Sequence, residues 1–353
     1  MPFSMGDRAP VVLGAAASGR FFSLDAQAGR PVVVVALGAL EPEAAARLLD
    51  RLRVAAPLVR AAGVDLAPLC PASPAFTARF ATDAQVRDEL LYVTTGEGVE
   101  LAHVGGAAAG VLVDRSGRVV DIIPLSETTD IAAWLSASAR RICAEPSQIR
   151  ASTAPVLILP NIASPELCRA LIDHFEAAPH EAGVMASFKD GGAYAKLDED
   201  KKKRRDTELT ADMPLHSDVV ELFAKRVIPE IRRAFQTDMA FADRILIARY
   251  DDTGGYFKRH RDNAAPHTAF REFAISLNLN TDEYEGGEIL FPEFDDHRYN
   301  PPAGGALVFS ASLLHEAAPV TRGSRYVLLS FFGGAAAQAK LDAWVENQKA
   351  IAS

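Results

Sequence analysis

The hydrophobic pattern of this chain changes near residue 150, and no other feature constrains the fold as strongly. Before that point, apolar runs alternate between strand-like and helix-like spacing. Beyond it, two helical patterns are followed by many short strand-like segments. The polar stretch at 144–154, AEPSQIRASTA, has no period of its own. We therefore expect two domains, 1–150 and 151–353, with a boundary near Arg150.

The first half predicts an α/β sandwich. The continuous β-branched run Pro31–Leu37 is typical of a strand buried on both faces. A helix is predicted over Glu41–Leu58 and a second core strand over Gly63–Leu69. Gly110–Ile123 predicts two strands joined by a tight turn, and Asp130–Ile142 predicts a closing helix. This βαβ…ββα order indicates a sheet covered by helices.

The second half predicts two helices followed by a β-sandwich or barrel. After a short strand at Val156–Leu159, Ser164-Pro165 begins a helix that runs to Ala177. A second helix is expected over Ser217–Phe235, and a last one over Gln338–Ile351. The apolar stripe of the second helix would be Val220, Phe223, Val227 and Ile231. The last helix would pack through Leu341, Trp344 and Val345. The strand-like segments between them are ILIARY, REFAISLNLN, GGEILFP, AGGALVFS and RYVLLSFFGG.

Composition excludes several classes of protein. Hydrophobic residues make up 49% and charged residues 24%, which is the balance of a globular protein with ample core material. A net charge of -9 argues against a general binder of nucleic acid or anionic membrane. Three cysteines cannot form a disulfide framework, so we expect a reducing, cytoplasmic location. There is no signal-peptide pattern, and the longest apolar run, Pro31–Leu40, is too short to span a bilayer.

Two histidines and an aspartate have the spacing of a metal site. In His260-Arg261-Asp262 the first and third residues would point to one side of a strand, so an imidazole and a carboxylate can converge. His315 follows the predicted strand Ala306–Ser310. Two histidines and one carboxylate are the set that holds Fe(II) on one face and leaves coordination positions open. Ten residues later, Arg325 could bind a carboxylate through both guanidinium nitrogens.

A His-X-Asp pair alone is weak evidence, and the chain contains a second one, His216-Ser217-Asp218. There the two last residues are interpreted as N-terminal caps of the following helix. The later histidine and the spaced arginine distinguish the pair at His260.

With these motifs in order, residues 244–334 resemble the Fe(II)/2-oxoglutarate-dependent dioxygenases of the prolyl 4-hydroxylase type. The segments that carry the resemblance are RYDDTGGYFKRHRD, FREFAISLNLNTDEYEGGEILF and PPAGGALVFSASLLHEAAPVTRGSRYVLLSFF. The resemblance implies an α+β double-stranded β-helix (jelly-roll) domain with supporting helices. Iron would be held by His260, Asp262 and His315, all of them catalytic together with Arg325.

The same resemblance assigns the cosubstrate site. Arg325 stands where the family pairs a basic residue with the distal carboxylate of 2-oxoglutarate, and Tyr250 stands where some members place a tyrosine on that carboxylate. Asn278 replaces a second tyrosine found in several members. Ser276, Asn278 and Asn280 alternate with apolar residues, which fits either a polar pocket lining or an ordinary solvated sheet face.

The implied activity is hydroxylation of a C–H bond, with Fe(II), 2-oxoglutarate and O2 as cofactor and cosubstrates and ascorbate as a candidate reductant. The substrate would be a protein, a peptide or an amino acid-like molecule, with prolyl hydroxylation the leading specific expectation. Asp190–Asp206 contains five consecutive basic residues. It is either a solvated surface loop or a mobile lid that would favour an anionic substrate; a membrane partner is not expected, and nucleic acid is disfavoured.

Residues 5–125 resemble the redoxin (peroxiredoxin-like) branch of the thioredoxin fold. The matching features are the segment Met5–Pro10, the strand at Gly29–Leu37 and the hairpin at Val113–Val120. The helix that follows the strand would carry a reactive thiolate in that family, but Gly38–Ala44 contains no cysteine. Cys70, Cys143 and Cys168 lie elsewhere and are interpreted as incidental. We expect a binding or assembly role for this domain, such as homodimer formation.

Two other hypotheses remain from this stage. One is a redox or peroxide-linked protein acting through the N-terminal domain, which the missing cysteine disfavours. The other is a non-catalytic metal-binding module, which the intact triad and the spacing of Arg325 disfavour.

Overall fold

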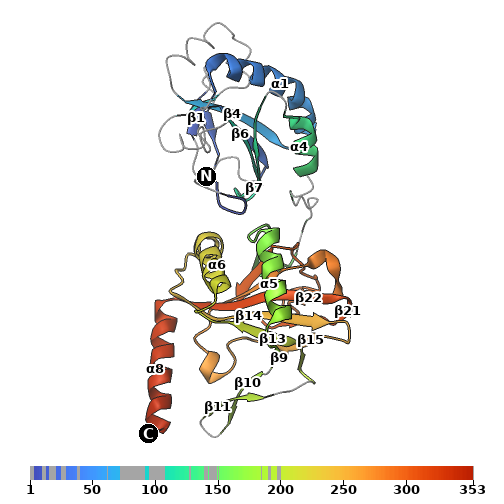
Figure 1. Cartoon of the computed structure of the whole chain (residues 1–353). Coiled ribbons are helices and arrows are strands. Elements are labelled where there is room, and N and C mark those ends of the chain that lie inside the picture. Colours follow the sequence, from blue (N-terminus) through green and yellow to red (C-terminus); the bar gives the residue numbers. More distant parts are fainter. Residues whose placement is uncertain are drawn as a thin grey trace. The chain divides into compact units, whose positions relative to one another are not determined.

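The computed structural model divides the chain into two compact units, Met1–Pro146 and Ser147–Ser353 (Figure 1). The division lies close to the boundary expected near Arg150. The structure describes residues 4–9, 13–15, 21–24, 29–37, 40–61, 63–71, 92–94, 108–126, 129–138, 142, 149, 151–183, 185–189, 192–196 and 200–352.

The N-terminal unit is built on a mixed sheet with the strand order β2-β1-β5-β4-β3-β6-β7. Its centre is parallel, because β3 pairs with β4 and β4 with β5 in the same direction, whereas β6 and β7 are antiparallel. The strands are β1 (Leu13–Ala15), β2 (Phe21–Ser23), β3 (Val32–Ala36), β4 (Asp65–Pro71), β5 (Tyr92–Thr94), β6 (Ala109–Val113) and β7 (Val119–Pro124).

The run of valines in β3 is buried on both faces, as predicted. Val33 and Val35 join the cluster that contains helix α1, and Val32 and Val34 join the cluster on the opposite face. Helix α1 spans Pro42–Ala61 and continues past the predicted end at Leu58. Leu48, Leu49 and Leu52 of this helix are buried. Helix α4 spans Ile131–Ser138, and Ile142 lies in a bend instead of the predicted helix.

The C-terminal unit contains two main sheets. The larger sheet has seven strands in the order β8-β19-β16-β22-β14-β13-β9, and the smaller has four in the order β12-β15-β20-β18. Two short pairs, β10–β11 and β17–β21, complete it. The strands are β8 (Val156–Leu159), β9 (Glu181–Ala182), β10 (Met185–Lys189), β11 (Gly192–Lys196), β12 (Lys202–Lys203), β13 (Arg205–Leu209), β14 (Phe241–Asp251), β15 (Tyr256–His260), β16 (Phe273–Asn278), β17 (Glu285–Gly286), β18 (Ile289–Leu290), β19 (Ala306–Ser310), β20 (His315–Ala317), β21 (Val320–Arg322) and β22 (Ser324–Gly333).

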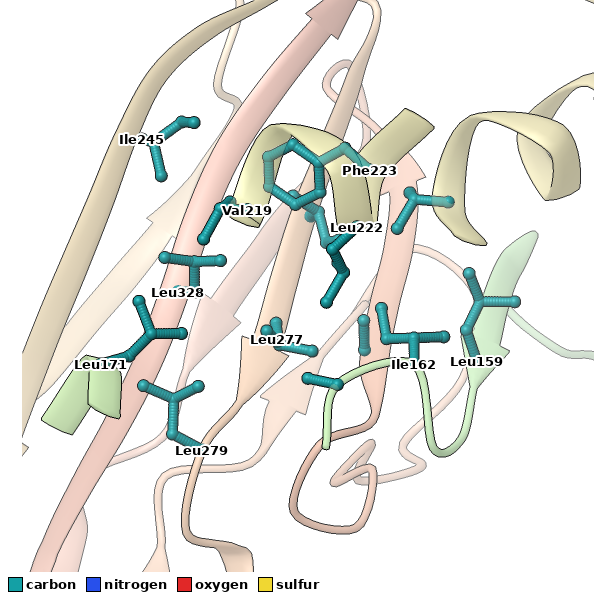
Figure 2. Close-up of a cluster of buried hydrophobic side chains, with 14 of the residues drawn as sticks. Leu159, Ile162, Leu171, Val219, Leu222, Phe223, Ile245, Leu277, Leu279 and Leu328 are labelled. Atoms are coloured by element: carbon teal, nitrogen blue, oxygen red, sulfur yellow. The ribbon is translucent and has the colours of Figure 1, made fainter. Parts of the chain in front are cut away.

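The two faces of the seven-stranded sheet bury different partners. Alternate residues such as Ile275, Leu277 and Leu328 pack under helices, and Figure 2 shows Leu171, Val219 and Phe223 from those helices around the same cluster. The residues that alternate with them pack against the four-stranded sheet, in a cluster that joins both sheets and includes Tyr250. Helices therefore support one face of the large sheet, while the small sheet encloses the other.

The first covering helix, α5, follows its sequence signals. It spans Pro165–Ala177, and the hydroxyl of Ser164 accepts a hydrogen bond from the backbone N–H of Leu167. That bond satisfies one of the free N–H groups of the first turn, with proline at the next position.

The second predicted helix differs from expectation at its start and in its phase. Helix α6 spans Pro214–Leu222, a π-helical turn covers Phe223–Val227, and α7 spans Ile228–Phe235. Because proline opens the helix, Ser217 and Asp218 lie inside α6, and their interpretation as caps was wrong. Val220 is 42% exposed, and Val219 takes its place in the core. The wider π turn keeps Phe223, Val227 and Ile231 on the buried side.

The last helix, α8, spans Ala335–Ala352 and begins earlier than predicted. Leu341, Trp344 and Val345, the residues expected to dock it, are half-buried. Among the described residues, no helix has the length and apolar character needed to cross a membrane.

Candidate active site

The small sheet brings the three predicted metal ligands together. His260 ends β15 and His315 begins β20, and the two pair directly in the antiparallel register. Asp262 lies just beyond β15, where its backbone N–H donates to the carbonyl of Ala311. His260 Nε2 lies 3.4 Å from Asp262 Oδ1, and His315 Nε2 lies 3.5 Å from Asp262 Oδ2. The ligand atoms of all three lie within 4.8 Å of one another.

Backbone carbonyls orient both imidazole rings. His260 Nδ1 lies 2.8 Å from the carbonyl oxygen of Lys258, and His315 Nδ1 lies 3.0 Å from that of Leu313. A carbonyl oxygen can only accept a hydrogen bond, so each Nδ1 carries a proton. Each Nε2 is the nitrogen that lies toward Asp262, which is the arrangement that a metal ligand requires.

The charge states also suit a metal. Burial lowers the pKa of the His315 imidazole to about 4. Burial alone would raise the pKa of Asp262, but the nearby His315 and His260 rings outweigh it and lower that pKa to about 2. Near neutral pH the site thus combines a neutral imidazole with an ionised carboxylate. Two nitrogen donors and one carboxylate fit Fe(II), and the three residues lie close enough together to hold one metal ion.

The triad forms one side of a small cavity with apolar walls. Phe257 stacks on His260 with ring centroids 3.4 Å apart, and Phe309 meets His315 edge-on at 4.7 Å. The cavity volume is ≈ 60 Å³, room for about five water molecules. Besides these residues and Asp262, its lining is Arg204, Tyr250, Ala274, Ile275, Ser276, Ile289, Ala317, Arg325, Leu329 and Phe331.

Arg325 is a buried cation in this cavity, and it lacks a carboxylate partner within the described residues. It is 2% exposed and lies on β22, between β16 and β14. Its Nη2 donates to Ser276 Oγ at 3.2 Å and to Asn278 Oδ1 at 3.1 Å, while its Nε has no hydrogen-bond partner. Tyr250 pairs with it across the strands, and the guanidinium lies 5.3 Å from the phenol ring. A buried guanidinium of this kind is matched to a ligand carboxylate.

The polar face of β16 supports Arg325 more than it lines the cavity. Ser276, Asn278 and Asn280 are all buried, so the solvated-face interpretation was wrong. Ser276 lines the cavity, whereas Asn278 contacts the guanidinium and donates to Asn300 Oδ1 and the carbonyl of Pro301. Asn280 accepts from the backbone N–H of Tyr326. Asn278 thus acts through Arg325, which makes it a positioning residue in this structure.

The Gly-Gly-Glu motif makes room for the same arginine. Gly287 has φ +70°, and a Cβ there would lie 2.7 Å from Arg325 Cδ and 3.0 Å from Val320 Cγ2. Gly286, with φ +79°, would place a Cβ 2.3 Å from the carbonyl oxygen of Pro319. Any side chain at Gly287 would compete for the space that Arg325 occupies.

Sequence reasoning missed Arg204, the second guanidinium of the cavity. It belongs to the basic run at 201–205, and the solvated-loop interpretation was wrong for two residues of that run: Lys202 is in β12, and the side chains of Lys202 and Arg204 are 6% and 7% exposed. The lid interpretation of the whole segment stays a prediction. Arg204 Nε lies 2.7 Å from Asp206 Oδ1, and Arg204 Nη1 donates to the Tyr250 hydroxyl at 2.8 Å. Residues 190, 191 and 197–199 of the predicted loop lie outside the described residues.

The period-two spacing of Lys202, Arg204 and Asp206 is the signal that could have identified this cluster. Alternate residues of a strand share a face, so a carboxylate can pair with both cations. Burial and the neighbouring Arg204 lower the pKa of Lys202 to about 7, although Asp206 Oδ2 lies 3.3 Å from its Nζ.

Two other groups singled out in the sequence lie away from the cavity. His216 and Asp218 are on α6 and do not line it. Cys70 and Cys168 are free and buried, and burial raises the pKa of their thiols to about 12 and about 11, which suppresses thiolate chemistry. Cys143, Gly38 and Ala39 lie outside the described residues.

Comparisons with known proteins agree with this geometry. Residues 245–333 match the 2OG-Fe(II) oxygenase superfamily. A PKHD-type hydroxylase from Picosynechococcus sp. is 26% identical over 183 residues, which cover 49% of this chain and 75% of that protein. One from Methylobacterium nodulans is 39% identical over 89 residues, covering 23% of this chain and 39% of the relative.

Solved structures are similar at lower identity. A prolyl hydroxylase from Trichoplax adhaerens, in complex with a hypoxia inducible factor peptide fragment, has a TM-score of 0.44 at 15% identity and covers 53% of this chain and 87% of its own. A prolyl-4-hydroxylase from Pseudomonas putida has a TM-score of 0.39 at 18% identity and covers 52% and 94%. The family match covers all the residues that line the cavity except Arg204. The C-terminal unit therefore contains a 2OG-Fe(II) oxygenase domain, and the chain is a 2-oxoglutarate-dependent hydroxylase.

Proposed function

We propose that the C-terminal unit hydroxylates a peptidyl proline of a protein or peptide substrate, with a double-stranded β-helix as its scaffold. The observation that carries the activity is the cavity in which the unpaired guanidinium of Arg325 shares one small volume with His260, Asp262 and His315. The prolyl specificity is supported by the resemblance of the motif order to the prolyl 4-hydroxylase type.

The residues of the cavity have separate tasks in this proposal. His260, Asp262 and His315 would hold the iron, and Arg325 and Tyr250 would hold the distal carboxylate of 2-oxoglutarate. When bound, iron and 2-oxoglutarate supply, with dioxygen, the oxidising power for the hydroxylation and release succinate and carbon dioxide. Phe257, Phe309 and Phe331 keep the cavity apolar, which excludes water and strengthens the pairing of the carboxylate with Arg325.

The N-terminal unit is proposed to be a redoxin-like, thioredoxin-fold scaffold that assembles the protein as a cytoplasmic homodimer. Its parallel centre flanked by the antiparallel β6–β7 pair supports that fold. The burial of Cys70 argues against thiol chemistry at that residue. Light scattering on the full chain and on residues 151–353 tests the role: equal numbers of copies per particle would contradict it.

The test of the activity begins with protein purified without oxygen and loaded with Fe(II). It should bind 2-oxoglutarate in calorimetry and, once oxygen is admitted, form succinate. With a proline-containing peptide, mass spectrometry should find one added oxygen atom on proline. Failure of the metal-loaded protein to bind 2-oxoglutarate would overturn the oxygenase proposal, whereas modification of another residue type would overturn only the prolyl specificity.

A matched pair of variants isolates the metal site. Asp262→Ala should abolish succinate formation, because it removes the carboxylate between the two imidazoles. Asp218→Ala alters the other His-X-Asp motif of the chain, on α6, and should leave activity unchanged. Equal losses in the two variants would point to a general folding effect instead.

A further inference from the structure

Two clefts lie on the outer side of the metal site, along β15 and β20. The first has a volume of ≈ 460 Å³ and is lined by Lys201, Phe257, Lys258, Arg259, His260 and Glu316. Because His260 and Phe257 also line the inner cavity, this cleft borders the metal site directly. The second has a volume of ≈ 390 Å³ and shares Lys258 and Glu316 with the first. Together they form a continuous mouth, which we call the outer groove.

The outer groove carries an excess of positive charge. Its cations are Lys201, Lys258, Arg259 and Arg298, all exposed, and its one lining carboxylate is Glu316. Arg259 pairs with Glu316 at 3.5 Å, and Arg298 pairs with Glu288 at 3.0 Å.

Within the described residues, two lysines of the groove have no ion-pair partner. Neither Lys201 nor Lys258 forms an ion pair with a described carboxylate, and the backbone N–H of Lys258 donates to the carbonyl of Lys201, which holds them side by side. This concentration of charge contrasts with the whole chain, whose 46 acidic residues outnumber 37 basic ones. A local basic surface on an acidic protein attracts anionic ligands selectively.

The remaining lining distinguishes a peptide from a nucleic acid. Leu290, Ala317, Ala318 and Pro319 give the second cleft an apolar wall, which suits a hydrophobic residue or a proline ring. Its aromatic residue, Tyr256, has the Lys258 ammonium 5.6 Å from its ring centroid. A groove for single-stranded nucleic acid offers successive aromatic faces to successive bases, whereas the lining of the second cleft contains this one aromatic residue.

We propose that the outer groove binds an acidic peptide segment, with carboxylate side chains on Lys201 and Lys258 and an apolar residue against Pro319. The segment would place its hydroxylated residue next to His260. This inference deepens the proposed function and rests on it. It specifies that the substrate has acidic residues near the hydroxylated position.

The test compares labelled peptides by fluorescence anisotropy on the Fe(II)-loaded protein with 2-oxoglutarate, without oxygen. Each peptide has a central Ala-Pro-Ala segment, flanked on both sides by Glu-Asp-Glu, by Gln-Asn-Gln or by Lys-Lys-Lys. The acidic peptide should bind more tightly than the neutral one, the basic one should bind least, and added salt should reduce the difference. Lys201→Ala and Lys258→Ala should each weaken the acidic peptide by about 2- to 5-fold.

Lys340→Ala is the matched control, because Lys340 is an exposed lysine on α8 that lines neither cleft. Equal affinity for the three peptides, or equal losses in Lys258→Ala and Lys340→Ala, would overturn the inference. Tighter binding of an oligothymidine strand than of the acidic peptide, lost in Lys258→Ala, would overturn it in favour of nucleic acid. Calorimetry with 2-oxoglutarate on the unaltered protein distinguishes this inference from the proposed function. If 2-oxoglutarate binds but the three peptides bind equally well, the acidic-peptide inference is refuted and the proposed hydroxylase function is not.

Discussion

Substituting Gly287 by alanine should disable the site for the distal carboxylate of 2-oxoglutarate, although the substitution replaces no charged residue. The new Cβ would lie 2.7 Å from Arg325 Cδ, whereas carbon atoms in contact are normally about 3.5–4.0 Å apart. Arg325 would therefore have to shift by about 1 Å. It is 2% exposed and hydrogen-bonded to Ser276 and Asn278, so a shift of that size moves the guanidinium away from these two partners.

The size of the effect follows from the bonds that the shift disturbs. The two hydrogen bonds from Arg325 Nη2 are already 3.1–3.2 Å long, and a further 1 Å would break them. A hydrogen bond to a charged group contributes about 1.5–3 kcal/mol. If the contact with the ligand carboxylate suffers by a similar amount, the Kd for 2-oxoglutarate should rise by roughly 10- to 100-fold.

Gly254→Ala is the matched control for this substitution. Gly254 has φ +89° and open space around its Cβ position, so alanine there meets only the backbone cost of about 1–2 kcal/mol. Urea denaturation should show that backbone cost in both variants, and calorimetry should show the loss of affinity in Gly287→Ala alone. If the two variants bind 2-oxoglutarate within about twofold of each other, the argument that Gly287 makes room for Arg325 is wrong.

Three further substitutions test the buried charges. Arg204→Leu leaves Asp206 with Lys202 alone and should lower the unfolding free energy in urea by about 3–5 kcal/mol, against under about 1 kcal/mol for Arg322→Ala, whose pair with Glu285 is exposed. Lys202 has a pKa of about 7 in the fold and about 10.4 when unfolded, so between these values the unfolded chain binds the extra proton. Stability should therefore rise with pH from about 7 to 9.5 in the wild type, relative to Lys202→Met, by up to about 1.4 kcal/mol per pH unit; parallel pH profiles would contradict this. Arg325→Met removes a buried cation that has no carboxylate partner within the described residues, so its thermal stability without ligand should not fall. 2-Oxoglutarate at about 100 times its Kd should stabilise the wild type by about 2.7 kcal/mol and leave this variant unchanged; an equal response in both would refute the assignment of Arg325.

The elements with a local physical cause were predictable from sequence. The β-branched run of β3 and the Ser164-Pro165 start of α5 were found where the sequence placed them, because burial on two faces and capping depend on neighbouring residues. The start of α6 was misplaced because Ser217 and Pro214 are both start signals. The local sequence preference for a helix start cannot choose between two such signals, because tertiary packing decides which residues of the helix face the core.

The burial of the charged residues, by contrast, could not be predicted from the local sequence. Five basic residues in a row are usually solvated, and the strand pairing that buries Lys202 and Arg204 involves β14 and β15, about fifty residues away. Partners at that distance leave no trace in the local pattern apart from the alternate spacing with Asp206. The contact of Asn278 with Arg325 could not be predicted for a related reason, because it depends on the pairing of β16 with β22.

The two guanidiniums beside Tyr250 differ in what they can still bind, and that difference supports the role expected for the tyrosine. The charge of Arg204 is paired with Asp206, and its Nη1 donates to the phenol oxygen, so Arg204 is not an unpaired cation available to a ligand. Since that oxygen accepts from Arg204, the Tyr250 O–H is still available to donate, and none of the described residues accepts from it. Arg325 faces Tyr250 across the strands with its charge unpaired. A carboxylate entering the cavity would therefore meet one free cation and one free hydroxyl, both held in place before it arrives.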